Sequence, residues 1–304
     1  MRKKSEAVTV RSQKFTGDFT RVRLFCFSAL VIALILAAVF ADRICPYDPN
    51  QQDLGSALQA PSLAHPFGTD RYGRDMLSRV LIGAQTSIFS ALILVAVIAA
   101  AGTAAGVLCG YFGGVLDAVI MRIADICLAF PGLVFAMAIA AVLKGGIQNA
   151  VLALAAVSWP KYARIARSQT LSVRQADFIC AARLSGSTPG QIIFRHVLPN
   201  IAGPILVTAM LDIGTMMMEI AALSSLGLGA QPPTAEWGSM ISSDRSMLQT
   251  YPWVVLAPGL AIFVSVVLFN LLGDTVRDCL DPRGTGKKQK TIRAGGIGEG
   301  PRRD

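Results

Sequence analysis

The amino-acid sequence predicts an all-α, polytopic membrane protein with six transmembrane helices. The hydrophobic content is 53%, and only 15% of the 304 residues are charged. This is more apolar surface than one soluble core of this size needs. A spanning helix requires about 20 mostly apolar residues. Runs of about this length or longer recur along the whole chain, at residues 24–41, 81–109, 115–143, 147–165, 200–229 and 253–273.

Basic residues at the two ends of the chain predict its orientation. Residues 1–23 and 276–304 are both rich in Lys and Arg. Cytoplasmic flanks of membrane proteins carry such an excess, so both termini are expected in the cytoplasm, and an even number of spans agrees. The net charge of +9 therefore follows from membrane topology, and no nucleic-acid partner is expected.

Residues 24–41 are predicted to form the first transmembrane helix. A secretory signal peptide cleaved after Ala41 is the alternative. The apolar run is longer than the usual core of about 7–15 residues, and cleavage would leave five spans with the basic tail outside. We therefore expect the segment to remain as a span.

Residues 42–80 balance acidic against basic side chains and are rich in turn residues. They are predicted to form an ordered extracytoplasmic segment with one short interfacial helix, in which His65 makes a structural hydrogen bond. The second external connection, residues 230–252, is followed by Trp253. We expect the rings of Trp237 and Trp253 at the membrane interface.

Residues 81–275 are predicted to form the main transmembrane domain. Gly102, Gly106 and Gly110 recur every four residues and line one face of a helix, where a second backbone can approach closely. They are predicted to serve helix packing. The alternative is the general abundance of glycine in membrane helices.

Ionisable residues inside spans are functional candidates. Asp212 and Glu219 share a helix face with Met216, and this face is predicted to line a translocation path or to pack against a partner. Asp125 is predicted to pair locally with Arg122. No metal site and no cofactor are expected.

Residues 166–198 are predicted to form a cytoplasmic loop with two short helices. A small-residue face beginning at Phe178 gives the first helix, and Gly186 supplies a left-handed stop. Thr188 is predicted to cap the second helix, with Gln191 closing a capping box. This helix is expected to end before Pro199, because proline disfavours a helical conformation at the residue before it.

A short helical hairpin with an apolar and basic face suits a groove on another protein. The alternative is an amphipathic hairpin lying on lipid headgroups. The residues proposed to carry the docking are Asp177, Cys180, Ala181, Ala182, Arg183, Gly186, Ile192, His196, Leu198 and Pro199.

The loop resembles the EAA loop of permease subunits in binding-protein-dependent ABC importers, in which two alanines precede a glycine and a later Leu-Pro pair. Further motifs similar to the branch that imports dipeptides, oligopeptides and nickel occur in the family's order, within residues 20–283. They are "HPFGTDRYGRDMLSRVLIGAQTS", "GYFGG", "LAFPGL", "FRHVLPN", "SLGLGAQPPTAEWG" and "FNLLGDTVRDCLDPR".

This resemblance implies the type I ABC importer permease fold in a bacterial plasma (inner) membrane. It also implies partners: a second homologous permease, two ATP-binding ABC subunits, an extracytoplasmic solute-binding protein and a small-molecule substrate within the lipid bilayer. The chain has no G-x-x-x-x-G-K-[ST] phosphate-binding loop. We therefore expect that it is not an enzyme and that partner subunits hydrolyse ATP.

Cys180 stands where the family usually has Glu, and a reactive thiol there is an alternative that Arg183 would favour. Asp177 lies one turn earlier and is predicted to replace the missing carboxylate. Unchanged coupled ATP hydrolysis in Asp177→Ala would contradict this hypothesis.

The resemblance implies import of di- or oligopeptides. Import of nickel or a metal chelate is the alternative, because "TAEWG" and "LDIGTMMM" are closer to the nickel branch. A secondary transporter and an intramembrane enzyme are the remaining classes. His65 and His196 are predicted on opposite sides of the membrane, which disfavours the enzyme.

Overall fold

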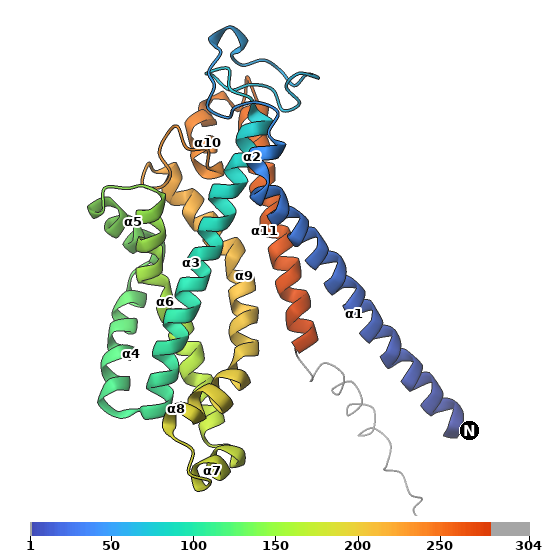
Figure 1. Cartoon of the computed structure of the whole chain (residues 1–304), viewed down its shortest axis with the longest axis vertical. Coiled ribbons are helices and arrows are strands. Elements are labelled where there is room, and N and C mark those ends of the chain that lie inside the picture. The colour runs from blue at the N-terminus through green and yellow to red at the C-terminus, as the bar shows by residue number, and fades with distance from the viewer. Residues whose placement is uncertain (1, 281–304) are drawn as a thin grey trace, which may run out of the picture.

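The chain folds into a bundle of long helices without a named β-strand in the part that is described (Figure 1). The computed structural model describes residues 2–280, with side chains from residue 21 onward. The basic segment after residue 280 lies outside this range. In order, the helical elements are α1 (Arg2–Val39), α2 (Ala41–Ile44), η1 (Leu54–Ser56), α3 (Met76–Phe112), α4 (Gly114–Ala129), α5 (Gly132–Val142), α6 (Ile147–Arg174), α7 (Asp177–Leu184), α8 (Pro189–Ile192), η2 (Ile193–Val197), α9 (Leu198–Ser225), α10 (Trp237–Asp244), η3 (Arg245–Met247) and α11 (Trp253–Leu280).

Each predicted span coincides with a long helix or with a bent pair of helices. Four helices of the described chain are long and apolar enough to cross a membrane, and a fifth span is counted if the bent pair α4 and α5 is one. The helix α6, the remaining predicted span, carries Lys161, Arg164, Arg167 and Arg174 in its second half. These charges explain why it is less apolar than its neighbours.

The run at residues 115–143, predicted as one span, forms two helices, α4 and α5, which meet at an angle of 95°. The break falls at Phe130 and Pro131. Phe130 is extended (φ −104°, ψ 151°), as expected for a residue before proline. Pro131 has no N–H to continue the helical hydrogen-bond ladder.

The two ends of the bundle differ in structure (Figure 1). One end holds residues 42–75 together with α10, and the opposite end holds α7 and α8. The first turn of α1 and the last turn of α11 also lie at the α7–α8 end. The termini of the described chain are therefore on the same side as the predicted docking loop.

The segment that precedes α3 is ordered by polar contacts. Asp75 caps α3 by accepting a hydrogen bond from the backbone N–H of Ser78 at 2.8 Å, and the Nδ1 atom of His65 lies 2.9 Å from its other carboxylate oxygen. The predicted structural hydrogen bond of His65 is thus confirmed. Asp53 caps η1, and hydrogen bonds from the hydroxyl of Ser56 and the N–H of Gly55 lower the pKa of its carboxyl.

The ring of Trp237 is not exposed, contrary to what a position at the membrane interface would require. Its side chain is buried in the main core, where Nε1 donates a hydrogen bond to the carbonyl oxygen of Val80 at 2.9 Å. Gly83 provides the space, since a Cβ there would lie 2.7 Å from the indole ring. Trp253 is half-buried. The indole of Trp237 therefore fastens α10 to α3.

The helices α3 and α6 pack along the glycine stripe of α3. A Cβ on Gly102 would lie 2.6 Å from the Cβ of Tyr162, and one on Gly106 would lie 2.8 Å from the Cβ of Ala166. Gly110 faces Thr170 in the same way. Small residues on both helices allow this close approach.

We expect Gly106→Ala to destabilise the protein by about 1–3 kcal/mol, because the added methyl group has no room between α3 and α6. Thermal unfolding of the purified protein in detergent measures this. Gly259→Ala in α11 is the matched control, because a Cβ there meets no other atom within 4 Å. Equal melting temperatures for the two variants would contradict the expectation.

Candidate coupling and translocation sites

The predicted hairpin forms at α7 and α8, at the end of the bundle opposite residues 42–75 (Figure 1). Gly186 adopts a left-handed conformation with φ +81° and ends α7. The backbone N–H of Thr188 donates to the side chain of Gln191 at 2.9 Å, and Thr188 Oγ1 accepts from the N–H of Gln191 at 3.4 Å. The predicted capping box is therefore confirmed.

The second helix of the hairpin does not end before Pro199, which corrects the sequence-based expectation. Leu198 is helical (φ −55°, ψ −45°), and the π-turn η2 joins α8 directly to α9. Pro199 lies in the first turn of α9, where its missing N–H costs little. The π-turn, with its wider hydrogen-bond ring, leads into the proline without an intervening loop.

A small apolar core anchors the hairpin to the bundle. Ile179, Ile192 and Val197 are almost completely buried and pack in one cluster with Val107 of α3 and Ala166 of α6. The guanidinium of Arg183 lies 5.8 Å from the centroid of the Tyr111 ring. The buried face of the hairpin is thus anchored to α3 and α6.

The outer side of the hairpin is exposed and partly apolar. Leu184 is 91% exposed and Phe194 is 72% exposed. The predicted small-residue face also points outward, as Phe178, Ala181 and Ser185 are exposed. The predicted docking residues divide into exposed Asp177, Cys180, Ala181, Arg183, Gly186 and Pro199, half-buried Ala182, His196 and Leu198, and buried Ile192.

We expect Thr188→Ala to destabilise the hairpin by about 1 kcal/mol, because the capping hydrogen bond to the N–H of Gln191 is lost. Amide hydrogen exchange at residues 177–197 measures this local opening. The control is Ser187→Ala at the neighbouring position. Equal exchange rates in both variants would contradict the role of the cap.

A polar cluster joins α6 to α9 within the bundle. The Nζ atom of Lys161 lies 2.5 Å from Asp212 Oδ1, and the hydroxyl of Tyr162 donates to Asp212 Oδ2 at 2.9 Å. The side chain of Asp212 is 6% exposed, whereas that of Lys161 is 51% exposed. The ammonium group therefore remains accessible while the carboxylate is buried.

The sequence singled out Asp212 but missed Lys161 and Tyr162. They lie about 50 positions earlier in the chain, so helical spacing gives no signal for the pair; a basic residue inside a predicted span was the available clue. Met216 is buried in the main core. Glu219 is half-buried on the same helix.

Two further cations of α6 pair with acids of α4. Arg164 lies 2.6 Å from Asp125, so the predicted local pair of Asp125 with Arg122 is wrong. Arg167 forms a bidentate pair with Asp117, with distances of 2.5 and 2.6 Å. Lys161, Arg164 and Arg167 recur every three residues, and each pairs with an acid on another helix, which offsets the cost of charge in a membrane. Arg174 donates instead to the carbonyl oxygen of Gly110 at 3.4 Å.

Together, these features define a multi-span membrane protein with an exposed helical hairpin at one end and an accessible charged group within its helices. Residues 102–285 match the family described as the binding-protein-dependent transport system inner membrane component. Residues 16–61 match the N-terminal transmembrane domain of oligopeptide transport permease C. The chain belongs to the family of binding-protein-dependent ABC transporter permeases.

Relatives in this family align over most of the chain. The chain is 44% identical to a probable D,D-dipeptide transport system permease protein of Escherichia coli, covering 86% of this chain and 88% of the relative. It is 43% identical to a dipeptide transport system permease protein of Alkalihalophilus pseudofirmus, covering 84% of each chain. It is 45% identical to a glutathione transport system permease protein of Shigella sonnei, covering 92% and 93%.

The fold is also similar to that of a solved transporter. The inward-facing MetNI methionine ABC transporter matches with a TM-score of 0.56 and 19% identity, covering 68% of this chain and 98% of the matched chain. This similarity supports the type I importer permease fold. The chain is thus an inner membrane component of a transport system, and its family works with ATPase and binding-protein partners.

Proposed function

We propose that the chain is the permease subunit of an ATP-driven importer of di- or oligopeptides. The observation that carries this proposal is its 43–45% identity, over at least 84% of its length, to permeases named for dipeptide and glutathione transport. Substrate would come from an external binding protein. A second homologous permease would complete the path, and two ATP-binding subunits would supply the energy.

In this proposal the hairpin of α7 and α8 couples ATP hydrolysis to transport. Its exposed apolar groups suit a groove on an ATPase subunit, and its buried face transmits displacement to α3 and α6. Asp177 is exposed at the start of α7 and supplies the carboxylate that Cys180 does not. In this proposal, the end of the bundle that carries the hairpin lies in the cytoplasm, and the chain termini lie on the same side.

The path would run along the face that holds Lys161 and Asp212. The half-exposed ammonium group of Lys161 can contact a carbonyl or carboxylate of a passing peptide, while Asp212 fixes its position. Glu219 lies two turns further along α9, so the path would present charges of both signs to a zwitterionic substrate. Met216 would support this face from the core.

The test is ATP hydrolysis by the reconstituted complex of both permeases and both ATPase subunits. The binding protein is added empty, then loaded in turn with a dipeptide, glutathione, an oligopeptide or a nickel chelate. Stimulation by a peptide is the expected result. Stimulation by the nickel chelate alone would assign metal chelates, instead of peptides, as the substrate. Stimulation by none of the ligands would reject the importer.

A further inference from the structure

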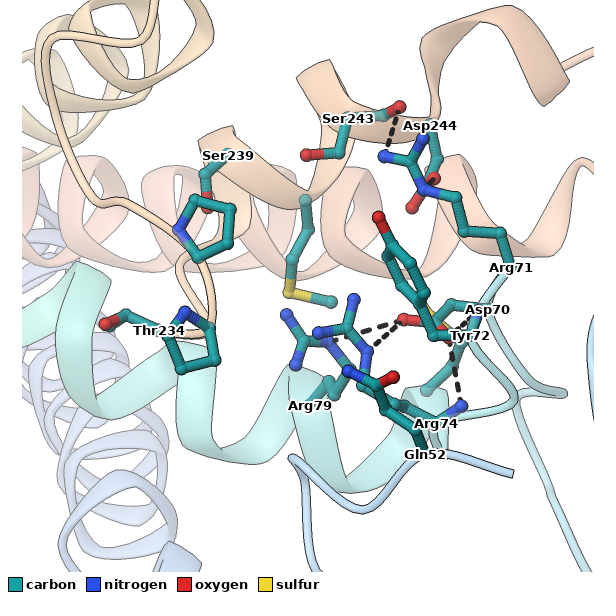
Figure 2. A pocket seen from close by; sticks show the side chains of 14 residues that line it. Gln52, Asp70, Arg71, Tyr72, Arg74, Arg79, Thr234, Ser239, Ser243 and Asp244 are labelled. Carbon is teal, nitrogen blue, oxygen red and sulfur yellow. Dashed lines mark hydrogen bonds and ion pairs between the residues drawn. The ribbon is translucent and has the colours of Figure 1, made fainter. Parts of the chain in front are cut away.

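A polar pocket of about 330 Å³ lies at the end of the bundle opposite the hairpin. It is formed by the start of α3, the chain before it, the loop at residues 232–234 and α10 (Figure 2). Guanidinium groups from three arginines, Arg71, Arg74 and Arg79, line it together with the carboxylates of Asp70 and Asp244. Fully ionised, these five groups carry one excess positive charge.

Asp70 is shared between two of the arginines. Its Oδ2 atom accepts from Arg74 Nε at 2.6 Å, and the same oxygen lies 3.8 Å from Arg79 Nε. Its Oδ1 atom accepts from the backbone N–H groups of Tyr72 and Arg74. Both carboxylate oxygens are therefore occupied, and Asp70 does not hydrogen-bond Arg79.

Arg79 is the most deeply buried of the three arginines, with 5% of its surface exposed. Its Nη1 atom donates to the backbone carbonyl of Pro49 at 3.0 Å. The nearest carboxylate is the shared one of Asp70. A buried guanidinium is costly without a well-placed anion, and its fork of donors suits a carboxylate.

Arg71 and Asp244 also have hydrogen-bonding atoms without a partner. Arg71 Nε lies 3.1 Å from Asp244 Oδ1, but the two atoms are not aligned for a hydrogen bond, and both are buried without another partner. Arg71 instead donates through Nη2 to the carbonyl of Ser243 at 2.9 Å. Burial raises the pKa of the Asp244 carboxyl, while the charge of Arg71 opposes this shift.

We propose that this pocket binds the terminal carboxylate of a peptide as it enters from the binding protein, with Arg79 and Arg74 as the anion-binding groups. This inference rests on the proposed function. The volume lies in the range of small-ligand pockets. Hydroxyl groups of Thr234, Ser239 and Ser243 line the pocket and can bind the peptide amides, and Met76 and Met240 offer an apolar surface for a side chain.

The experiment measures occupancy of the pocket without transport. Ser243→Cys, on the exposed wall of the pocket, is introduced together with Cys45→Ser into the full complex in nanodiscs. A negatively charged thiol reagent is then added, and labelling at residue 243 is followed by peptide mass spectrometry, because Cys180 and Cys279 are also exposed. The probes are dialanine and dialanine amide, which differ in the terminal carboxylate, at concentrations up to about 20 mM, near the weak limit of measurable binding.

Dialanine is expected to slow labelling at least threefold, and dialanine amide is expected to leave it unchanged. Arg79→Gln should raise the dialanine concentration for half-protection at least tenfold, equivalent to about 1.4 kcal/mol. Arg43→Gln is the matched control, since Arg43 is an exposed arginine at the same end of the bundle and outside the pocket. In this variant, dialanine should protect the thiol at the same concentration as in the parent.

Asp244→Asn is a second variant, which distinguishes an effect on binding from misfolding of the Arg79 variant. This variant removes a carboxylate that competes with dialanine for the arginines. It should therefore lower the dialanine concentration for half-protection, whereas Arg79→Gln raises it. Equal protection by dialanine and its amide, or by neither, would overturn the proposal. So would protection by the empty binding protein alone, which would assign the pocket to an acidic side chain of that protein.

The outcome is separate from that of the proposed function. Stimulated ATP hydrolysis without protection of the thiol would leave the peptide importer standing and reject the pocket. Protection by dialanine without any peptide-stimulated ATP hydrolysis would support the pocket and reject the peptide importer.

Discussion

Leu184→Asp is expected to reduce binding-protein-stimulated ATP hydrolysis of the complex to its basal rate. Leu184 lies at the end of α7 and is 91% exposed, so the substitution leaves the fold of the permease intact. A buried carboxylate at the centre of an interface costs about 2 kcal/mol or more, which is about a 30-fold loss of affinity. The amount of ATPase subunit that co-purifies with the permease measures the same effect.

Val142→Asp is the matched control. Val142 is 82% exposed and ends α5, a helix that does not contribute to the hairpin. This variant should retain the ATPase subunits and their stimulation. Loss of both in the two variants alike would mean that any exposed charge disrupts the complex, and the hairpin would no longer be assigned to coupling.

Asp212→Ala is expected to destabilise the permease by about 2–3 kcal/mol and to abolish transport. The substitution removes the partner of Lys161 and the acceptor of the Tyr162 hydroxyl. Breaking a buried ion pair from one side is strongly unfavourable. The half-exposed position of Lys161 reduces this cost below that of a fully buried pair. Thermal unfolding in detergent and uptake into proteoliposomes measure the two effects.

The double variant Lys161→Met with Asp212→Leu separates stability from transport. Apolar replacement of a whole ion pair is often neutral, so its melting temperature should return close to that of the parent while uptake remains lost. Recovery of uptake along with stability would assign the pair to structure alone. Arg164→Gln with Asp125→Asn, an exposed pair between α6 and α4, should change stability by less than about 1 kcal/mol.

Local sequence signals predicted the hairpin well. The capping box at Thr188 and the left-handed Gly186 depend on residues within a few positions of each other, and both are confirmed. The spacing of apolar runs likewise predicted the helical membrane fold. Such features are set by side chains that contact their own backbone or lipid, so the sequence contains the information directly.

Contacts between distant helices were not accessible in this way. The partners of Asp212 and Asp125 both come from α6, and the expected pair with Arg122 failed because the nearest residue in sequence is not the nearest in space. Leu198 and Phe130 show a second limit. Each directly precedes a proline and has the same local preference, yet Leu198 continues a helix and Phe130 ends one.

The uninterrupted backbone from α8 through η2 into α9 has a mechanical consequence. Because no loop separates α8 from the helix that carries Asp212, we expect the two to move together. Under the proposed function, a displacement of the hairpin would then reach Asp212 through α9. Displacement of the hairpin by the ATPase subunits and opening of the translocation path would then occur at the same time.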